Sequence, residues 1–540
     1  MNGEQLSLFE TGLPLKDVAL KFSVSEATVR NWIHEGILRA NGNFLSQQEV
    51  ENFVSNGFGK KLKSRANKTK KDSHCEVDLS NFVRESVKNK TLSGNELAVQ
   101  YESALSESYK NKEGVYYTPE DIASDMLKSI TNVEDKTFLD PCCGSGNFLL
   151  AALEKGFKPE NLYGFDTDAN AIEITKRRIF EVSGVEPKNI ICCDFFAWSK
   201  CQNVKFDYIF TNPPWGKKIP KQEKMKLAEL FKAGNSSDTC ALFFFASLSL
   251  LQQNGQLGLL LPEAFFNIGT FVDARKTLML YKLLRLIDYG KPFKGLMTKA
   301  KAFVMEHTHA LAENVECELY GKRTNLRTQS SFQGIPKHII NFNLTDEEAR
   351  VIKQVYQKKH VTLRGHASWA LGIVTGDNEK HCKSVQYAGY VPIYRGKDIF
   401  PDHVSEPELF INENLQFCQQ VAPKSFYQAS EKVIYRFISN RIVCFYDTQQ
   451  RYILNSANLF ILNENFKIPY QYIVDLLNSD FMNWLFSSLF CTHKILRGDL
   501  EELPIWTEYF EKHSSFDEKK LLAYLNIEKD YGTYRIKRAN

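Results

Sequence analysis

The sequence lacks the long apolar runs that mark membrane-spanning and secreted chains. Its longest apolar stretch, residues 241–251, is interrupted by serines and is too short to cross a bilayer, which takes roughly 20 apolar residues. Residues 1–10 contain no basic start followed by an apolar core, so we expect no secretory signal. These absences predict a cytoplasmic protein without a membrane partner.

The sequence also lacks the spaced cysteine pairs of structural zinc sites. It has 12 cysteines, but no two of them are separated by two residues, and Cys142–Cys143 and Cys192–Cys193 are directly adjacent. Zinc sites need ligand pairs at a spacing that lets both side chains reach one ion. A cytoplasmic chain keeps its thiols reduced, so we expect no metal site and interpret the cysteines as small buried residues.

The composition is that of a globular protein. Hydrophobic residues make up 43% and charged residues 24%, which excludes a mainly disordered chain. At roughly 150 residues per domain, a length of 540 residues predicts about three or four domains. The 68 basic and 64 acidic residues nearly cancel, so the total charge alone identifies no partner.

The N-terminal segment shows the pattern of a small helical domain. Residues 13–22 and 25–36 are expected to form helices, and Asn41-Gly42 indicates a tight hairpin. Ser46 and Glu49 have the spacing of a capping box that opens a third helix. The arrangement resembles a helix-turn-helix of the MerR or excisionase kind; a generic protein-contact module is the alternative.

This resemblance predicts a DNA-binding domain over residues 1–58, with Arg30 pointing outward toward DNA. We expect residues 59–92 to form a basic linker, because residues 60–71 contain seven basic and no acidic side chains. Such a run can also contact phosphates without regard to base sequence.

The middle of the chain alternates short apolar runs with helical stretches. Apolar runs end at Asp140, Asp166, Asp194 and Asn212. Strand–helix alternation predicts an α/β fold over residues 93–325, with a mainly parallel sheet and helices on both faces. Ligands of such sheets bind beyond the carboxyl ends of the strands, so the residues that follow these runs form the candidate site.

The first three strand ends favour a nucleoside ligand. The glycines of Gly144-Ser145-Gly146 let the backbone turn tightly at the positive end of a helix. A carboxylate after the second strand suits a ribose diol. No Lys-Ser or Lys-Thr follows the glycines, so the ligand need not be a phosphate, and a nucleoside with a positively charged tail fits better.

The fourth strand ends in Asn212-Pro213-Pro214-Trp215. Two prolines cannot continue a strand ladder, so the chain leaves the sheet with its carbonyl groups free. An amide oxygen, a carbonyl oxygen and an aromatic face are therefore expected together at the rim of the sheet. Residues 310–344 are polar and are expected to be irregular, whereas residues 345–540 mix β-like pieces with helices and predict a separate α+β domain.

Taken in order, these motifs resemble the S-adenosylmethionine-dependent N6-adenine DNA methyltransferases of the γ class, the TaqI-like group. The segments that carry the resemblance are GVYYTP (114–119), FLDPCCGSGNFL (138–149), YGFDTD (163–168), CDFFAW (193–198), FDYIFTNPPWG (206–216) and NGQLGLLLPEAFF (254–266). More loosely, the C-terminal phrases resemble the target-recognition domains of this group: GIVTGDNEKH, YVPIYRGKDI, SANLFIL and KILRGDLEELPI.

The resemblance implies S-adenosylmethionine as the cofactor and double-stranded DNA as the substrate. Ten residues would hold the methionine end, the ribose hydroxyls and the adenine of the cofactor. In chain order they are Tyr117, Thr118, Pro119, Asp140, Gly144, Gly146, Asp166, Thr167, Asp194 and Phe195. Asp166 would take the ribose, and Asp194 the cofactor's amino group.

The resemblance likewise implies that residues 212–215 act on the target base. Asn212 and the carbonyl of Pro213, followed by Pro214, would accept the two hydrogens of the target amine, Trp215 would stack on the base, and Phe293 would supply a second face. Two acceptors localise the nitrogen lone pair for direct in-line displacement, which needs neither a metal nor a covalent enzyme intermediate. The base must first flip out of the duplex.

Sequence choice is expected to lie in residues 345–540. Candidates for contact with bases or phosphates are Arg395, Lys397, Arg436 and Lys494. We expect the modification enzyme of a restriction-modification or related defence system, with a cognate restriction endonuclease or another defence subunit as a possible partner. No nuclease pattern precedes residue 114, so no cleavage is expected.

Three alternatives stay open. Trp215 stands where many relatives carry Tyr or Phe, and a larger ring admits cytosine-N4 chemistry. Asn-Pro-Pro-aromatic sequences also occur in RNA and protein methyltransferases, which are usually smaller. A non-catalytic DNA-binding subunit is the third alternative, although the intact acids and residues 212–215 speak against it.

Overall fold

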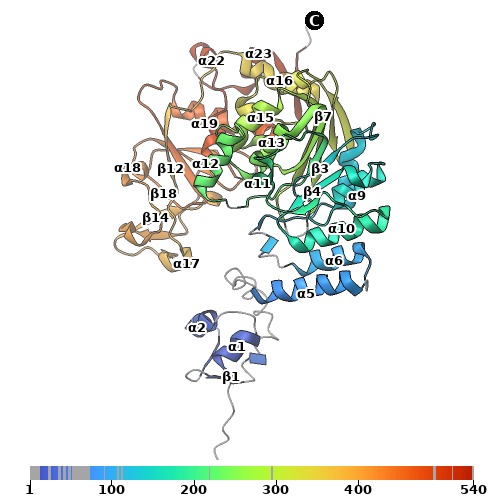
Figure 1. The fold of residues 1–540 in the computed structure, drawn as a ribbon. Helices are drawn as coiled ribbons and strands as arrows, with labels where there is room; N and C mark the ends of the chain where they lie inside the picture. Colours follow the sequence, from blue (N-terminus) through green and yellow to red (C-terminus); the bar gives the residue numbers. More distant parts are fainter. Residues whose placement is uncertain are drawn as a thin grey trace, which may run out of the picture.

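Figure 1 shows the computed structural model, which describes most of the chain. The described residues are 13–21, 26–34, 38–40, 44–46, 50–51, 73–89, 92–105, 109–110, 113–217, 219–293, 296–490, 494–513 and 515–537. Within these ranges, no helix combines the length and the apolar character needed to cross a membrane.

The centre of the molecule is a mainly parallel sheet with the strand order β11-β10-β8-β9-β7-β6-β3-β4-β5. Strands β3 to β7 pair in parallel, whereas β9 is antiparallel to both β7 and β8. The predicted α/β core is confirmed. The strands are β3 (Phe138–Asp140), β4 (Leu162–Asp166), β5 (Ile190–Cys192), β6 (Phe206–Thr211), β7 (Leu251–Pro262), β8 (Lys282–Gly290), β9 (Ala300–Glu306), β10 (Val315–Leu319) and β11 (Arg323–Arg327).

Acidic side chains begin several of the helices that follow these strands. Asp168 accepts from the backbone N–H of Asn170 at 2.9 Å and so caps α10, and Asp194 caps α11 in the same way. The helices are α8 (Glu120–Met126), α9 (Asn147–Glu154), α10 (Ala169–Ser183), α11 (Phe195–Ser199), α12 (Lys221–Leu230), α13 (Thr239–Leu250), α14 (Ala264–Asn267) and α15 (Val272–Leu278).

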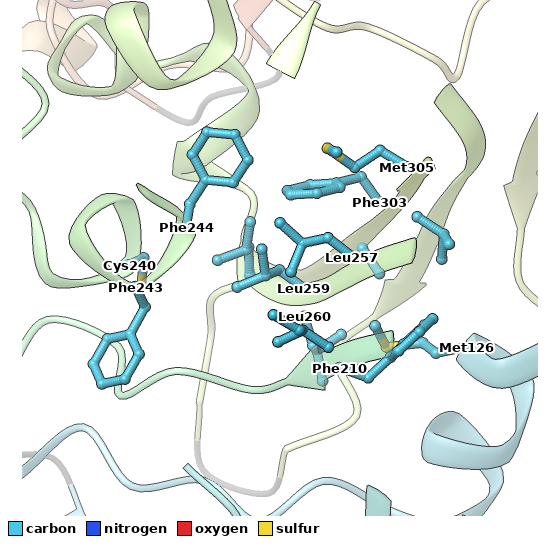
Figure 2. Close-up of a cluster of buried hydrophobic side chains, with 14 of the residues drawn as sticks. Met126, Phe210, Cys240, Phe243, Phe244, Leu257, Leu259, Leu260, Phe303 and Met305 are labelled. Atoms are coloured by element: carbon cyan, nitrogen blue, oxygen red, sulfur yellow. The ribbon is translucent and has the colours of Figure 1, made fainter. Parts of the chain in front are cut away.

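The longest apolar stretch of the sequence is the buried helix α13. A helix that is apolar all round belongs in a core. Figure 2 shows Phe244 of α13 near Leu257 and Leu259 of β7, with Phe303 of β9 behind them. The ring centroids of Phe244 and Phe303 are 5.7 Å apart, so this helix anchors the sheet from one face.

The expectation of an irregular segment over residues 310–344 is wrong for residues 315–327. β10 pairs in parallel with β8, and β11 pairs antiparallel with β10, so both strands extend the central sheet. β11 also runs past the predicted domain end at residue 325. β11 is the edge strand and β10 lies between it and β8, and charged residues such as Glu316 and Arg323 hide the apolar alternation that marks a strand.

The expectation of a linker is also wrong for part of residues 59–92, because residues 73–89 form helix α5 (Ser73–Asn89). Its apolar residues Leu79, Phe82 and Val83 pack in one cluster with α6 (Gly94–Ala104). Figure 1 shows α5 and α6 stacked against α10 of the catalytic core. The basic run at residues 60–71 lies outside the described residues.

The N-terminal segment contains β1 (Leu13–Pro14), α1 (Leu15–Lys21), α2 (Glu26–His34) and β2 (Phe44–Leu45). Val29 and Trp32 of α2 are buried with Val18 of α1. β2 pairs with β1 rather than with residues 38–40, so the expected local hairpin is wrong, because the strand partner comes from before the two helices. Asn41-Gly42 and residues 47–49 lie outside the described residues.

The C-terminal domain is α+β, as predicted. Its two sheets have the orders β12-β19-β16-β17 and β13-β15-β14-β18. The strands are β12 (Ala367–Leu371), β13 (Cys382–Lys383), β14 (Tyr390–Tyr394), β15 (Phe410–Asn412), β16 (Lys432–Arg436), β17 (Cys444–Asp447), β18 (Tyr452–Ile453) and β19 (Ala457–Leu462), with a terminal hairpin of β20 (Ile527–Asp530) and β21 (Thr533–Ile536). The helices are α16 (Asp346–Gln357), α17 (Asn378–His381), α18 (Lys424–Tyr427), α19 (Tyr470–Asn478), α20 (Asp480–Phe490), α21 (Arg497–Leu500), α22 (Thr507–Lys512) and α23 (Glu518–Leu525).

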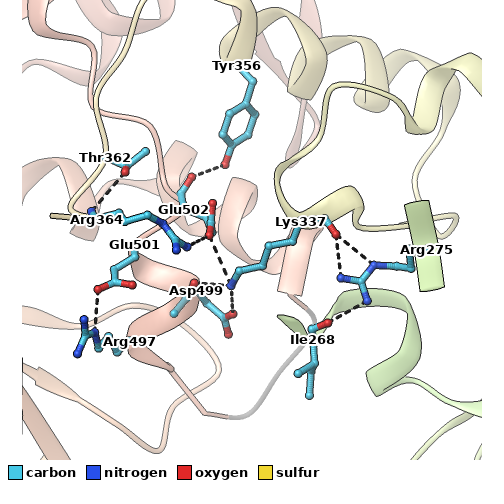
Figure 3. A network of polar contacts seen from close by, with 11 residues as sticks. Ile268, Arg275, Lys337, Tyr356, Thr362, Arg364, Arg497, Asp499, Glu501 and Glu502 are labelled. Atoms are coloured by element: carbon cyan, nitrogen blue, oxygen red, sulfur yellow. Dashed lines mark hydrogen bonds and ion pairs between the residues drawn. The ribbon is translucent and has the colours of Figure 1, made fainter. Parts of the chain in front are cut away.

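A polar network joins this domain to the catalytic core (Figure 3). Lys337 donates to the carbonyl of Gly498 and lies 3.4 Å from the Asp499 carboxylate. Arg275 of α15 donates to the carbonyls of Lys337 and His338 and, at 2.9 Å, to that of Ile268. The phrase KILRGDLEELPI therefore lies at the junction of the two domains.

Replacing Arg275 by methionine is expected to lower the free energy of unfolding by about 2 kcal/mol. The side chain is fully buried, and its loss leaves buried carbonyls without a donor, at about 1–3 kcal/mol for an unsatisfied group. Urea unfolding measures the change. Lys276→Met, at a neighbouring half-exposed position, is the control, and an equal loss in both variants would contradict the argument.

Candidate functional site

A cavity of about 280 Å³ opens at the carboxyl ends of β3, β4, β5 and β6. The predicted site residues that line it are Tyr117, Thr118, Asp140, Gly144, Asp166, Thr167, Asp194, Phe195, Asn212 and Pro214. The wall also includes residues that sequence reasoning missed: Glu113, Tyr116, Lys217, Thr239 and Phe243. The sequence could have identified two of these residues, because Tyr116 falls within the motif GVYYTP and Lys217 directly follows NPPWG.

The glycine loop between β3 and α9 needs both of its glycines. Gly144 has a φ of +49°, and a Cβ there would lie 2.9 Å from the ring of Tyr117. Gly146 has a φ of +93° and lies against the side chain of Thr175. Gly146 therefore packs against α10 and does not line the cavity, and neither does Pro119, which lies directly before α8.

A buried carboxyl group, Asp140, and a half-buried one, Asp166, form the acidic end of the cavity. Asp166 accepts from the backbone N–H of Gly144 and of Asp168, each at 2.9 Å. Asp140 accepts from the hydroxyl of Thr211 at 2.6 Å. Burial raises the pKa of Asp166 above its usual value and raises the pKa of Asp140 to about 7. The site therefore attracts a cation or a hydrogen-bond donor.

The next strand end provides one exposed acid and one buried ring. Asp194 is exposed and accepts from the backbone N–H of Ala197 at 2.8 Å, so it caps α11 with one oxygen. Phe195 is buried, and its ring stacks on Phe243 at a centroid distance of 5.7 Å. A flat apolar ligand ring can lie on this pair.

Asn212 is oriented by the segment that carries GVYYTP. Its amide nitrogen donates to the carbonyl of Tyr116 at 2.7 Å. Its Oδ1 is buried and has no hydrogen-bond partner among the described residues. An unpartnered buried acceptor costs about 1–3 kcal/mol, so this oxygen is arranged to receive a donor from a bound molecule.

The same segment holds the chain after Asn212. The backbone N–H of Trp215 donates to the carbonyl of Gly114 at 3.0 Å, and Lys217 lies 3.4 Å from the Glu113 carboxylate. Residues 113–116 and 212–217 thus run side by side along the cavity. The Asn212 amide is positioned by a backbone carbonyl from far earlier in the chain.

Three aromatic rings meet beside Asn212. Trp215 and Phe293 contact edge to face at 5.2 Å, and Tyr116 lies 5.6 Å from Phe293 and 6.1 Å from Trp215. The structure therefore brings the predicted pair Trp215 and Phe293 together and adds Tyr116. Trp215, Phe293 and the buried Pro213 do not line the cavity itself.

Cys142 and Cys143, which line this cavity, are poorly suited to act as nucleophiles. Burial raises the pKa of Cys142 and Cys143 well above the usual value for a thiol, which disfavours the thiolate that a nucleophile requires. Within the described ranges, no three His, Cys, Asp or Glu side chains gather as ligands for one metal ion.

The predicted DNA contacts fall in two places. In the C-terminal domain, Arg395 pairs with Asp398 and Glu408, and Lys397 also lies 3.6 Å from Glu408. Arg436 donates to the carbonyl of Ile399, so three of the predicted cations gather around residues 395–399. Lys494, also in the C-terminal domain, lies 5.8 Å from the ring of Phe437. The second place is the N-terminal segment, where Arg30 of α2 pairs with Glu26 at 3.9 Å.

Comparisons with known proteins find DNA methylases among the relatives of this chain. Residues 94–330 match the family model of the N-6 DNA methylases, and residues 391–505 match the TaqI-like C-terminal specificity domain. The chain is 43% identical over 403 residues to the Type II methyltransferase M.VspI of Vibrio sp. (strain 343), covering 73% of this chain and 99% of that protein.

Two more distant similarities extend the picture. The Type II methyltransferase M.AccI of Acinetobacter calcoaceticus is 26% identical over 313 residues, covering 53% of this chain and 56% of its own. The solved structure of the Type IIL restriction-modification enzyme MmeI in complex with DNA superposes with a TM-score of 0.50 at 11% identity, over 76% of this chain and 69% of that one, and shows the fold alone. With the substantial identity to M.VspI, these findings show that the chain belongs to the N6 DNA methyltransferases of the TaqI-like type.

Proposed function

We propose that this chain transfers the methyl group of S-adenosylmethionine to the N6 amine of an adenine flipped out of duplex DNA. The observation that carries the proposal is Asn212, whose amide nitrogen is fixed by Tyr116 while its buried Oδ1 awaits a donor. An exocyclic amine supplies such a donor.

The acidic cavity fits S-adenosylmethionine. The cofactor supplies an electrophilic methyl group on a sulfonium, and its ammonium and ribose hydroxyls need acceptors. Asp140 would hold the methionine end, and Asp166 the ribose. Each Asp166 oxygen already accepts one backbone N–H, which leaves one lone pair on each for a hydroxyl. The stacked Phe195 and Phe243 suit the adenine, with Asp194 close by for its amino group.

Asn212 and the carbonyl of Pro213 would accept the two hydrogens of the target amine. The lone pair of an exocyclic amine is delocalised into the ring, and acceptors aimed at both hydrogens draw the nitrogen toward tetrahedral geometry. Because the amide is fixed before the base arrives, little reorganisation is needed in the transition state. The base would stack on Trp215, with Phe293 and Tyr116 beside it, once the contact between Trp215 and Phe293 has opened.

We further propose that the chain is the modification enzyme of a restriction-modification system, since the named relatives M.VspI and M.AccI are Type II methyltransferases. Its work on cellular DNA would place it in the cytoplasm. Residues 391–505 would choose the target sequence, with the cations around residues 395–399 and Lys494 contacting bases or phosphates. Arg30 and the N-terminal domain would add a second DNA contact.

Methyl transfer from labelled S-adenosylmethionine to unmodified duplex DNA, followed by nucleoside analysis, tests the proposal. Label in N6-methyladenosine supports it. Label in N4-methylcytosine would be consistent with the proposed mechanism but would contradict adenine as the substrate. Measurable cofactor binding without labelled DNA would point to a missing subunit or to an RNA or protein acceptor.

Cofactor affinity is expected to be about eightfold weaker at pH 6 than at pH 7.5. Burial raises the pKa of Asp140 to about 7, so its carboxyl is mostly neutral at pH 6 and mostly ionised at pH 7.5, and the ionised form binds a positively charged cofactor more tightly. Calorimetric titration at both pH values measures the change. In Asp140→Asn the pH dependence should flatten, and an unchanged slope would contradict the assignment to Asp140.

A further inference from the structure

Two adjacent residues of α6 each bond one of the two loops that form the cofactor cavity. Tyr101 donates its hydroxyl to Asp168 Oδ2 at 2.5 Å. Glu102 Oε1 accepts from the hydroxyl of Ser145 at 2.6 Å. Asp168 follows β4, and Ser145 lies in the glycine loop after β3, so one helix outside the sheet contacts both loops.

The two loops meet at the carboxyl group of Asp166. Its Oδ2 accepts from Gly144, next to Ser145, and its Oδ1 accepts from the N–H of Asp168. The position of the Asp166 carboxylate therefore depends on the distance between the two loops. Tyr101 bonds Asp168 itself, whose N–H makes one of these bonds, and Glu102 bonds Ser145, which directly follows Gly144.

The helix α6 is itself firmly held. A capping box between Ser93 and Glu96 begins it, and Arg178 donates to Asn95 at 2.8 Å. Arg178 also donates to the carbonyl of Ser145 at 2.7 Å, so the same guanidinium ties the helix to the glycine loop. Tyr101 is 3% exposed and packs against Ile174 of α10. A rigid support of this kind can set the geometry of a loop.

We propose that Tyr101 and Glu102 are positioning residues that hold the two loops at the separation required to bind the methionine end and the ribose of S-adenosylmethionine together. The proposal rests on the proposed cofactor. Neither side chain lines the cavity, and their effect on the cofactor passes through Asp168, Ser145 and Asp166. Burial keeps the phenol of Tyr101 protonated by raising its pKa, so the donor is present at neutral pH.

Tyr101→Phe and Glu102→Ala are expected to raise KM and Kd for S-adenosylmethionine about tenfold each, with kcat changed less than twofold, because each removes one hydrogen bond to a carboxylate. Glu102→Gln should recover most of the affinity, since its amide oxygen can still accept from Ser145. Val99→Ala on the same helix is the control, because Val99 is 67% exposed.

Calorimetric titration of the full-length chain with S-adenosylmethionine, steady-state kinetics and thermal unfolding together decide the outcome. Failure of the wild-type chain to bind the cofactor would overturn the proposed function and, with it, this inference. Wild-type binding with unchanged Kd in Tyr101→Phe and Glu102→Ala would overturn the positioning role alone. A lower Tm with reduced kcat and unchanged KM would mean a merely structural role and would also overturn it. If Glu102→Ala does not fold, Ser145→Ala removes the same bond from the other side and should raise KM equally.

Discussion

Asn212→Ala is expected to lower kcat for methyl transfer by about 10³-fold while leaving the Kd for S-adenosylmethionine nearly unchanged. A preorganised group aimed at the reacting centre is typically worth about 10²–10³ in rate, and Asn212 Oδ1 is a buried side-chain oxygen that lacks a partner within the described part of the chain. Single-turnover transfer of labelled methyl to duplex DNA measures the rate, and calorimetry measures the cofactor affinity.

Asn212→Asp tests whether the residue must be oriented by Tyr116 in addition to accepting from the target amine. The carboxylate keeps an acceptor for the amine, but it cannot donate to the carbonyl of Tyr116, which now receives the amide at 2.7 Å. We therefore expect a large loss of kcat in this variant as well. Wild-type activity in Asn212→Ala would remove the residue from the mechanism. Full activity in Asn212→Asp would show that the bond to Tyr116 is not needed for orientation.

Gly114→Ala is expected to reduce kcat by about 10²-fold, because small displacements of reacting groups are costly. A Cβ at Gly114 would lie 2.4 Å from the carbonyl oxygen of Trp215, and the φ of +70° is already unfavourable for alanine. The clash would push residues 212–217 away from the segment that orients Asn212. Kinetics at saturating cofactor would show the loss in kcat.

Gly216→Ala is the matched control for this prediction. Gly216 has the same φ of +70°, but a Cβ there meets no described atom within 4 Å. Both variants therefore have backbone strain, but only Gly114→Ala also has the clash with Trp215. A similar loss of kcat in both variants would assign the effect to backbone strain. It would contradict the inference that contact between residues 113–116 and 212–217 orients Asn212.

The order of the strand ends could be read from the sequence. Apolar runs that end in Asp140, Asp166, Asp194 and Asn212 are local patterns, and parallel strands bring their carboxyl ends to one edge. The family resemblance added residues such as Tyr117 and Thr118, which precede these strands, and ten of the predicted site residues line the cavity. Patterns failed where charge hid them: the basic composition near residue 70 masked the start of α5, and charged side chains masked β10 and β11.

The amino-acid sequence by itself determined the fold class, the family and the edge of the sheet where the chemistry lies, because each depends on residues close together in the chain. Only the tertiary structure decided how the site is held. The bond from Asn212 to Tyr116 spans 96 positions, and those from Tyr101 to Asp168 and from Ser145 to Glu102 span 67 and 43. Contacts across such separations leave no periodic signal, because each is one hydrogen bond between groups that meet only after the sheet and its helices have packed.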